Sequence, residues 1–176
     1  ELFVVMEFVD GETLASEIAR GPLSASRARE VISQLLAALA HAHGHQIIHR
    51  DIKPANIMLA GRTVKVLDFG LAKQVTTAAA AASQSTTVTQ TAASTQPGAI
   101  MGTPAYMSPE QLTGNGVDLR TDIFACGVVL YQCLTGRLPF AGHGPTLHGA
   151  ILHADPAPPS GVDPLLAAVA LKALHK

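Results

Sequence analysis

One apolar segment, Ile123–Leu134, constrains the fold of this 176-residue chain more than any other feature. A helix that is apolar on every side must be buried in a protein core or in a membrane. A membrane span requires about 20 apolar residues, and this segment is shorter and contains Gln132. Gly136 follows the segment and is a typical helix terminator. We therefore predict a buried central helix over Asp122–Leu134.

The composition is that of one packed domain with almost no net charge. Hydrophobic residues make up 48% of the chain and charged residues 14%, so we expect most of it to pack around one core. The formal net charge is -1. Because such a chain does not attract nucleic acid or anionic lipid as a whole, we expect no nucleic-acid partner and no membrane contact from this segment.

The two cysteines indicate a reducing compartment. Cys126 and Cys133 lie two turns apart on the predicted central helix, so they face the same way and cannot form a disulfide with each other. Two free buried thiols favour a cytoplasmic location for this segment, whatever membrane anchor the full-length protein carries elsewhere. The chain begins at Glu1 without the regions of a signal peptide, and we interpret both of its ends as arbitrary cuts.

The remaining patterns predict a mainly helical α+β fold with a small hairpin. A long helix begins at a Ser24 or Ser26 cap and ends at Gly44, with an apolar stripe of Val31, Ile32, Leu35, Leu36, Leu39 and Ala42. The other predicted elements are a buried strand Leu2–Phe8, a turn at Asp10–Gly11, a helix Thr13–Arg20, hairpin strands Asn56–Leu59 and Thr63–Leu67, a helix Thr146–His153 and a last helix that begins at Asp163–Pro164.

Two short segments carry the residues suited to chemistry. His49–Asn56 contains Asp51, Lys53 and Asn56, and Asp68 follows twelve residues after Asn56. Mg²⁺ prefers oxygen ligands, which the side chains of Asn56 and Asp68 supply. A lysine such as Lys53 can neutralise a phosphoryl group in transfer, and a carboxylate such as Asp51 can deprotonate an attacking hydroxyl. The combination indicates a site for a phosphate and its metal ions.

The order H-R-D-x-K-P-x-N, followed by D-F-G at Asp68–Gly70, resembles the catalytic and metal-binding loops of protein kinases. Gly102–Glu110 is similar to the end of a kinase activation segment, with Ser108 where many members have Ala. Asp122 and Gly127 resemble the buried helix that supports the catalytic loop. The resemblance implies a bacterial eukaryotic-like serine/threonine kinase that uses ATP with Mg²⁺, or with Mn²⁺, and phosphorylates Ser or Thr hydroxyls of proteins.

The resemblance also implies a division of the chain. Residues 1–11 correspond to the last strand of the kinase N-lobe and the hinge, and residues 12–176 correspond to the C-lobe. The activation segment then covers residues 68–110 and contains a flexible loop at 74–100, which is free of charged residues.

Adenine would lie against the hinge. The resemblance makes Met6 the gatekeeper, sets the backbones of Glu7 and Val9 against the base, and places Met58 beneath it. Without the resemblance, Met6 and Met58 would both be interpreted as ordinary core residues, which methionine usually is. Lys53 and Thr103 occupy the two positions that in the family mark kinases acting on aliphatic hydroxyls.

Regulation by phosphorylation is a further hypothesis. Arg50 and Lys73 are expected to bind a phosphate placed on the loop between them, and the candidates are Thr86, Thr87, Thr89, Thr91 and Thr95. Thr89 and Thr91 lie in the string VTQTAA, which is similar to the autophosphorylated loop of bacterial eukaryotic-like kinases. Thr95 follows shortly after, and autophosphorylation between two copies would require self-association. The alternative is that the loop is rich in Thr because its composition is of low complexity.

The histidines His41, His43, His45 and His49 do not form a convincing metal site, because no acid or thiol lies among them. We interpret the helical ones as surface caps of the helix C-terminus and His49 as the packing residue of its motif.

Two alternatives differ from an active protein kinase. The Gly-rich loop, the strand lysine and the helix glutamate of the kinase template do not occur in these residues, and no arginine follows the last helix to pair with Glu110. We therefore expect the 176 residues alone to bind ATP poorly and to transfer phosphate negligibly. A pseudokinase scaffold would have lost the strand lysine. A small-molecule phosphotransferase shares the acid and amide arrangement but lacks a segment like Gly102–Glu110.

Overall fold

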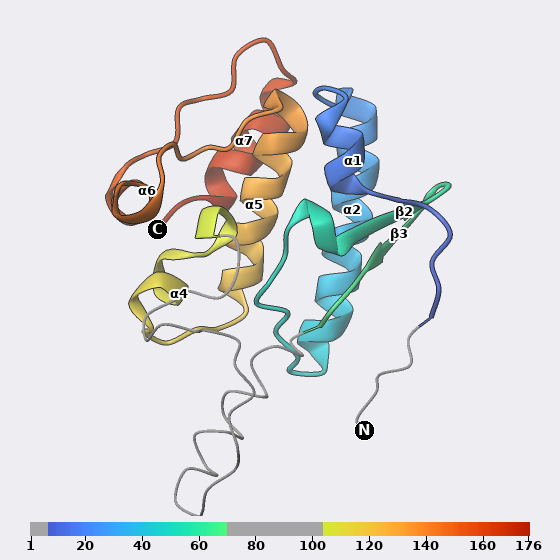
Figure 1. Ribbon diagram of the computed structural model, residues 1–176, viewed down its shortest axis with the longest axis horizontal. Coiled ribbons are helices and arrows are strands. Elements are labelled where there is room, and N and C mark those ends of the chain that lie inside the picture. Colours follow the sequence, from blue (N-terminus) through green and yellow to red (C-terminus); the bar gives the residue numbers. More distant parts are fainter. Residues whose placement is uncertain (1–6, 70–103) are drawn as a thin grey trace, which may run out of the picture.

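A computed structural model describes residues 7–69 and 104–176 of the chain. Two long helices, α2 (Ala25–Gly44) and α5 (Arg120–Thr135), stand side by side at its centre (Figure 1). Helix α7 (Pro164–Ala173) packs against α5, and the small sheet packs against α2. Helix α5 therefore lies between two other helices, which is the position that its apolar sequence predicts.

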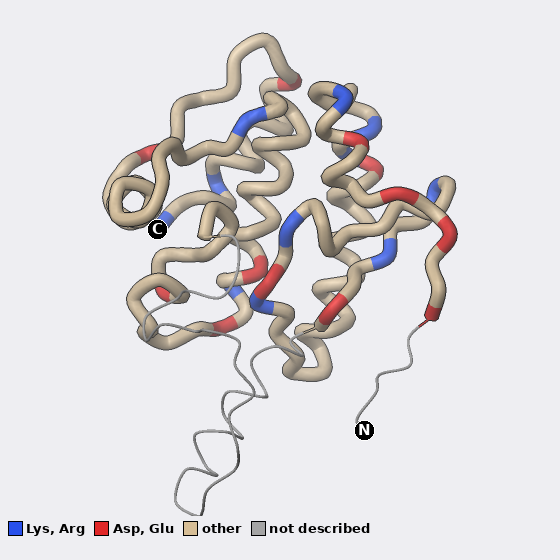
Figure 2. The backbone as a smooth tube through the Cα atoms, in the orientation of Figure 1, with Lys and Arg blue, Asp and Glu red and all other residues tan. Residues whose placement is uncertain are grey.

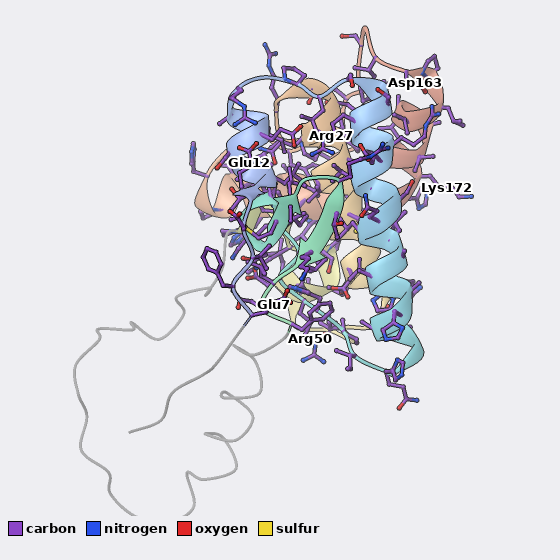
Figure 3. The ribbon with its side chains drawn as sticks, turned by 90° about the vertical axis from the view of Figure 1, so that its right-hand side faces the viewer. Glu7, Glu12, Arg27, Arg50, Asp163 and Lys172 are labelled. Carbon is purple, nitrogen blue, oxygen red and sulfur yellow. The ribbon has the colours of Figure 1, made fainter. Side chains whose placement is uncertain are left out.

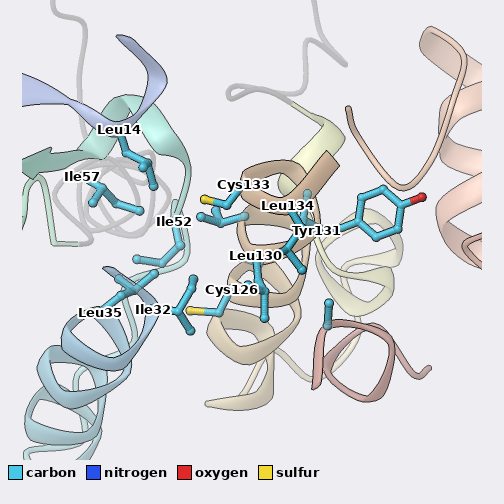
Figure 4. Close-up of a cluster of buried hydrophobic side chains, with 14 of the residues drawn as sticks. Leu14, Ile32, Leu35, Ile52, Ile57, Cys126, Leu130, Tyr131, Cys133 and Leu134 are labelled. Carbon is cyan, nitrogen blue, oxygen red and sulfur yellow. The ribbon is translucent and has the colours of Figure 1, made fainter. Parts of the chain in front are cut away.

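Helix α5 is buried along nearly its whole length and confirms the predicted central helix. It begins two residues before the predicted start and ends at Gly136, whose φ of 70° is the left-handed conformation that glycine tolerates best. Figure 4 shows its side chains meeting those of α2 in the core. Both cysteines are free and buried, as predicted. Burial raises the pKa of the Cys133 thiol to about 12, so it packs as an apolar group.

The two helices before the segment His49–Asn56 begin where their caps predict. Helix α1 (Leu14–Ala19) has Thr13 as its N-cap, and α2 is capped by Ser24 rather than Ser26. The predicted apolar stripe of α2 is buried except at Leu36, which is 37% exposed, so that assignment was wrong. Leu36 follows the fully buried Leu35 and turns away from the core, because adjacent helical positions point about 100° apart.

The sheet is antiparallel, with the order β1 (Glu12–Thr13), β2 (Ile57–Ala60) and β3 (Thr63–Val66). Strands β2 and β3 form the predicted hairpin, with Ala60 opposite Thr63. The short strand β1 has no counterpart in the sequence prediction. Phe8 was predicted to belong to a buried strand, but it is irregular and 87% exposed. None of the described residues buries its ring. Residues 2–6 of the predicted strand lie outside the described part of the chain.

Two short 3₁₀ turns and three further helices complete the described part of the fold. A 3₁₀ turn at Pro54–Asn56 leads into β2, and another at Pro104–Tyr106 precedes α4 (Pro109–Thr113). Helix α6 (Gly144–His153) begins two residues before its predicted start, and α7 has the predicted Asp163 cap. Within the described part of the chain, no helix is both long and apolar enough to cross a membrane.

Ion pairs join the first two helices to the hairpin. Arg27 on α2 binds Glu17 on α1 at 3.0 Å and Glu30 on its own helix at 3.1 Å, and Arg62 in the hairpin turn binds Glu30 at 3.2 Å. Arg27 lies between the two helices in Figure 3. Basic and acidic positions are interspersed over both halves of the described chain (Figure 2).

Gly127 on α5 provides a test of the packing between α5 and α7. A Cβ atom at Gly127 would lie 2.8 Å from the Cβ of Ala173, whereas a Cβ at Gly149 on α6 meets nothing within 4 Å. We expect Gly127→Ala to lower the free energy of unfolding by about 1–3 kcal/mol through overpacking. The matched change Gly149→Ala should raise it by roughly 0.5–1 kcal/mol, because alanine favours a helix. Urea unfolding measures both, and a gain in both variants would contradict the packing described.

Candidate active site

The buried carboxylate of Asp122 supports the segment that contains the candidate base. Asp122 is completely buried on α5. Its Oδ2 accepts a hydrogen bond from the backbone N–H of His49 at 2.9 Å, and its Oδ1 accepts one from the N–H of Arg50 at 2.8 Å. The imidazole Nε2 of His43 lies 2.8 Å from Oδ2. A buried carboxylate requires such donors, and here they hold the loop before Asp51 against α5.

A second set of hydrogen bonds joins this loop to the end of β3. The Nε2 of the buried His49 lies 2.8 Å from the carbonyl oxygen of Leu67, and the N–H of Leu67 donates to the carbonyl of Asn56 at 2.8 Å. The rings of His49 and Phe69 lie 4.7 Å apart. These contacts hold both neighbours of Asp68 in the sequence against the segment His49–Asn56. His49 has the packing role that the sequence indicated.

Asp51, Lys53 and Asn56 form one connected cluster. The ammonium of Lys53 lies 2.7 Å from Oδ2 of Asp51, and the amide Nδ2 of Asn56 donates to the same oxygen at 3.0 Å and to the Asp51 carbonyl at 2.9 Å. The Asp51 side chain is 46% exposed, so it remains open to a substrate. Asn56 is buried and uses Nδ2 in both bonds, which leaves its Oδ1 as the atom that can contact a cation.

Two residues of the site have backbones in the left-handed region. Arg50 has φ 68° and Asp68 has φ 58°. Residues other than glycine adopt this conformation at a cost of about 1–2 kcal/mol, so the surrounding contacts must hold it. The carboxylate of Asp68 is exposed. Its side chain is therefore accessible to a ligand.

The residues predicted to contact adenine lie around the hairpin. Met58 is half-buried and alternates along β2 with the core residues Ile57 and Leu59, so it is on the other face of the strand. It pairs in register with Lys65, whose ammonium forms an ion pair with Glu7. Val9 is half-buried in the same irregular segment. Met58 is therefore not one of the buried core residues, and it lies in the part of the fold that Glu7 also contacts.

A cavity of about 430 Å³ opens beside Lys53. The wall is formed by α1, the 3₁₀ turn before β2, and the hydroxyl of Tyr106, which donates to Gln132 at 2.7 Å. The cavity lies next to the Asp51 cluster, because Lys53 belongs to both. It offers space for part of a bound molecule close to the candidate base.

Several predicted site residues lie outside the described residues. They are the gatekeeper Met6, the specificity residue Thr103, the cation Lys73 and the candidate phosphorylation sites Thr86, Thr87, Thr89, Thr91 and Thr95. Arg50, the other predicted cation, is described, and it is exposed toward the end of the molecule at which Glu7 also lies (Figure 3).

The structure corrects the interpretation of one histidine and adds one connection. His43 is not a surface cap, because its ring binds Asp122 and its side chain is 13% exposed. His45 does cap α2, since its Nδ1 lies 2.9 Å from the carbonyl of His41. Sequence reasoning also missed Gln111, whose Nε2 donates to the carbonyl of Arg50 at 2.8 Å. The spacing of Ser108 and Gln111 is that of a capping box, which the sequence could have indicated, but that pattern does not predict the contact with Arg50.

Comparison with known proteins agrees with this geometry. A family model described as "Protein kinase domain" matches residues 1–155. The serine/threonine-protein kinase PknB of Mycolicibacterium smegmatis is 46% identical over 182 residues, which cover 99% of this chain and 27% of PknB. The serine/threonine-protein kinase Pkn1 of Myxococcus xanthus is 44% identical over 185 residues, which cover 99% of this chain and 24% of that protein.

The described residues form a mainly helical fold with a small antiparallel sheet, and the loop cluster lies next to that sheet. The chain belongs to the protein kinase family. It spans about a quarter of the length of the relatives named above. This confirms the resemblance drawn from the two loop motifs and the predicted fold class.

Asp122 provides a test of how the loop is held. We expect Asp122→Ala to lower the free energy of unfolding by about 3 kcal/mol or more, because it leaves two buried N–H groups without an acceptor. Asp118 is the control: it is an exposed carboxylate that pairs with Arg120 and accepts the backbone N–H of Arg120 at the start of α5, so Asp118→Ala should cost only about 0.5–2 kcal/mol. Urea unfolding monitored by circular dichroism compares them. Equal midpoints for the two variants would contradict the supporting role of Asp122.

Proposed function

We propose that this chain is the catalytic part of a serine/threonine protein kinase that transfers the γ-phosphoryl group of ATP to Ser or Thr hydroxyls of proteins. The observation that carries the proposal is the cluster of Asp51, Lys53 and Asn56, held against α5 by Asp122 and joined through Leu67 to Asp68. The relatives are named serine/threonine-protein kinases, which supports the same activity here. The buried free thiols on α5 support a cytoplasmic location for the domain.

In this proposal Asp51 is the general base. Its carboxylate is accessible and receives hydrogen bonds from Lys53 and Asn56 on Oδ2, which leaves Oδ1 to accept the proton of the substrate hydroxyl. Lys53 binds Asp51 and also lines the neighbouring cavity, and its charge can stabilise a phosphoryl group in transfer. Thr103 would orient the substrate hydroxyl toward this pair.

The donor set fits Mg²⁺ or Mn²⁺. Asn56 retains its amide oxygen, and Asp68 offers an exposed carboxylate, so both are the hard oxygen ligands that such ions prefer. A bound ion supplies positive charge that offsets the phosphate oxygens of ATP. The ordered hydrogen bonds of Asn56 hold its side chain in position before any ligand arrives.

The adenine of ATP is proposed to bind between the hinge and the hairpin. Met58 faces away from the core and offers an apolar surface for the base, and the backbones of Glu7 and Val9 offer hydrogen-bonding groups. Met6 would border this pocket. The ion pair between Glu7 and Lys65 keeps the hinge close to the hairpin.

The pseudokinase and small-molecule alternatives make different predictions. A pseudokinase scaffold would transfer no phosphate, and a small-molecule enzyme would phosphorylate choline-like or antibiotic substrates. The segment Pro104–Thr113 favours a protein substrate, because it places Tyr106 beside the cavity next to Lys53.

Replacing the base tests the proposal. In the full-length protein, we expect Asp51→Asn to reduce transfer to a Ser/Thr peptide library by about 100-fold to 10,000-fold, because an amide cannot accept the substrate proton. Radiolabelled ATP measures the rate, and thermal unfolding checks that the fold is retained. Asp118→Asn removes an exposed carboxylate elsewhere and should keep the rate of the unchanged protein.

Unchanged turnover in Asp51→Asn would refute the assignment of the base. Transfer to choline or an aminoglycoside in preference to peptides would favour the small-molecule alternative. No transfer by the unchanged full-length protein to any of these would favour a scaffold.

We further propose that phosphorylation between Thr86 and Thr95 regulates the enzyme, with Arg50 and Lys73 as the cations that bind the phosphate. Thr89, Thr91 and Thr95 are the preferred sites, and self-association would let one copy modify another. Mass spectrometry of the active full-length protein is expected to find phosphate in this stretch and to find none when Asp51→Asn is produced alone. An active enzyme without phosphate there would contradict this regulation.

A further inference from the structure

The side chain of Gln111 connects two parts of the site that are 61 positions apart in the sequence. Its Oε1 accepts a hydrogen bond from the N–H of Ser108 at 3.1 Å and so closes the capping box at the start of α4. Its Nε2 donates to the carbonyl of Arg50 at 2.8 Å. Both ends of one amide are therefore used, one within α4 and one on the loop before Asp51.

The carbonyl of Arg50 belongs to the peptide group that leads directly into Asp51. The N–H of the same peptide group, on Asp51, donates to Nδ1 of His49 at 3.2 Å, and the N–H of Arg50 itself donates to Asp122. Arg50 has a positive φ of 68°, which a residue with a side chain does not adopt unless contacts hold it there. Gln111 donates to the carbonyl side of this peptide group, directly before Asp51.

The segment that provides Gln111 is itself anchored to α5. The hydroxyl of Ser108 is buried 3.1 Å from the hydroxyl of Thr121, which donates to a carboxylate oxygen of Glu110 at 2.6 Å. The turn that carries Gln111 is therefore fixed to α5 by hydrogen bonds. A shift of this turn would change the contact with Arg50.

We propose that Gln111 is a positioning residue for Asp51, which transmits the placement of the segment Pro104–Thr113 to the loop that carries the base. The proposal rests on the proposed kinase function. An amide is needed because it accepts from Ser108 with one atom and donates to Arg50 with the other. A glutamate of the same shape keeps the acceptor and places a second acceptor against the Arg50 carbonyl.

The test is Gln111→Glu in the full-length protein, with steady-state kinetics on a Ser/Thr peptide. We expect kcat to fall roughly tenfold to a hundredfold, as for a small misplacement of a catalytic group. The KM values for ATP and peptide should stay within about twofold, because no binding contact is removed. Gln111→Met removes both hydrogen bonds without adding charge and should lower kcat by a similar factor. If Gln111→Glu does not fold, the kcat of Gln111→Met tests the positioning role instead.

Gln34 is a matched control because it has the same bonding pattern away from the site. Its Oε1 accepts from the N–H of Val64 at 3.0 Å, and its Nε2 donates to the carbonyl of Arg62 at 2.8 Å. Gln34→Glu loses an equivalent donor in the hairpin. It should shift the unfolding temperature as much as Gln111→Glu does and leave kcat unchanged.

Each outcome distinguishes the proposals. A fall in kcat for Gln111→Glu but not for Gln34→Glu supports the positioning role. If Gln111→Glu has an unchanged kcat per folded molecule, or only a raised KM for the peptide, the positioning role is wrong. The proposed function still stands in that case, provided that Asp51→Asn is inactive. If Asp51→Asn is as active as the unchanged protein, the proposed function fails first.

Discussion

The described fold depends on one buried carboxylate. Asp122 is fully buried on α5, a helix that is buried along most of its length, and an ionised group without partners would be strongly unfavourable there. It is stable there because the N–H groups of His49 and Arg50 donate to it, together with the ring of His43. The same hydrogen bonds determine where the loop before Asp51 lies. The requirement to satisfy one buried charge therefore places the candidate base relative to the core.

The positions of Arg50 and Asp68 follow from this arrangement. Both have positive φ values, and each such residue costs about 1–2 kcal/mol in local backbone energy. Arg50 is held by Asp122 and Gln111, and the strand before Asp68 is held by His49 and Asn56 through Leu67. Contacts that are distant in sequence thus maintain two unfavourable local conformations, and both conformations occur beside the proposed catalytic groups, where such strain is often concentrated.

Prediction from sequence succeeded where a local physical signal was strong. Ser24 and Asp163 cap their helices as expected, Gly136 ends α5, and the hairpin turns between Ala60 and Thr63. It failed where burial depends on distant neighbours. Phe8 is exposed although its segment is apolar and β-branched. Leu36 is apolar but lies at the edge of the helix face that α2 buries, so it is partly exposed.

The sequence by itself determined the family and the candidate catalytic residues, because Asp51, Lys53, Asn56 and Asp68 occur at a characteristic spacing and the loop chemistry depends on residue type. Only the tertiary structure decided how these residues are held. Asp122 meets its donors across more than 70 positions, and Gln111 meets Arg50 across 61. Contacts of such separation arise when α2, α5 and the hairpin pack together, and no local pattern of residues encodes which carbonyl a glutamine will reach.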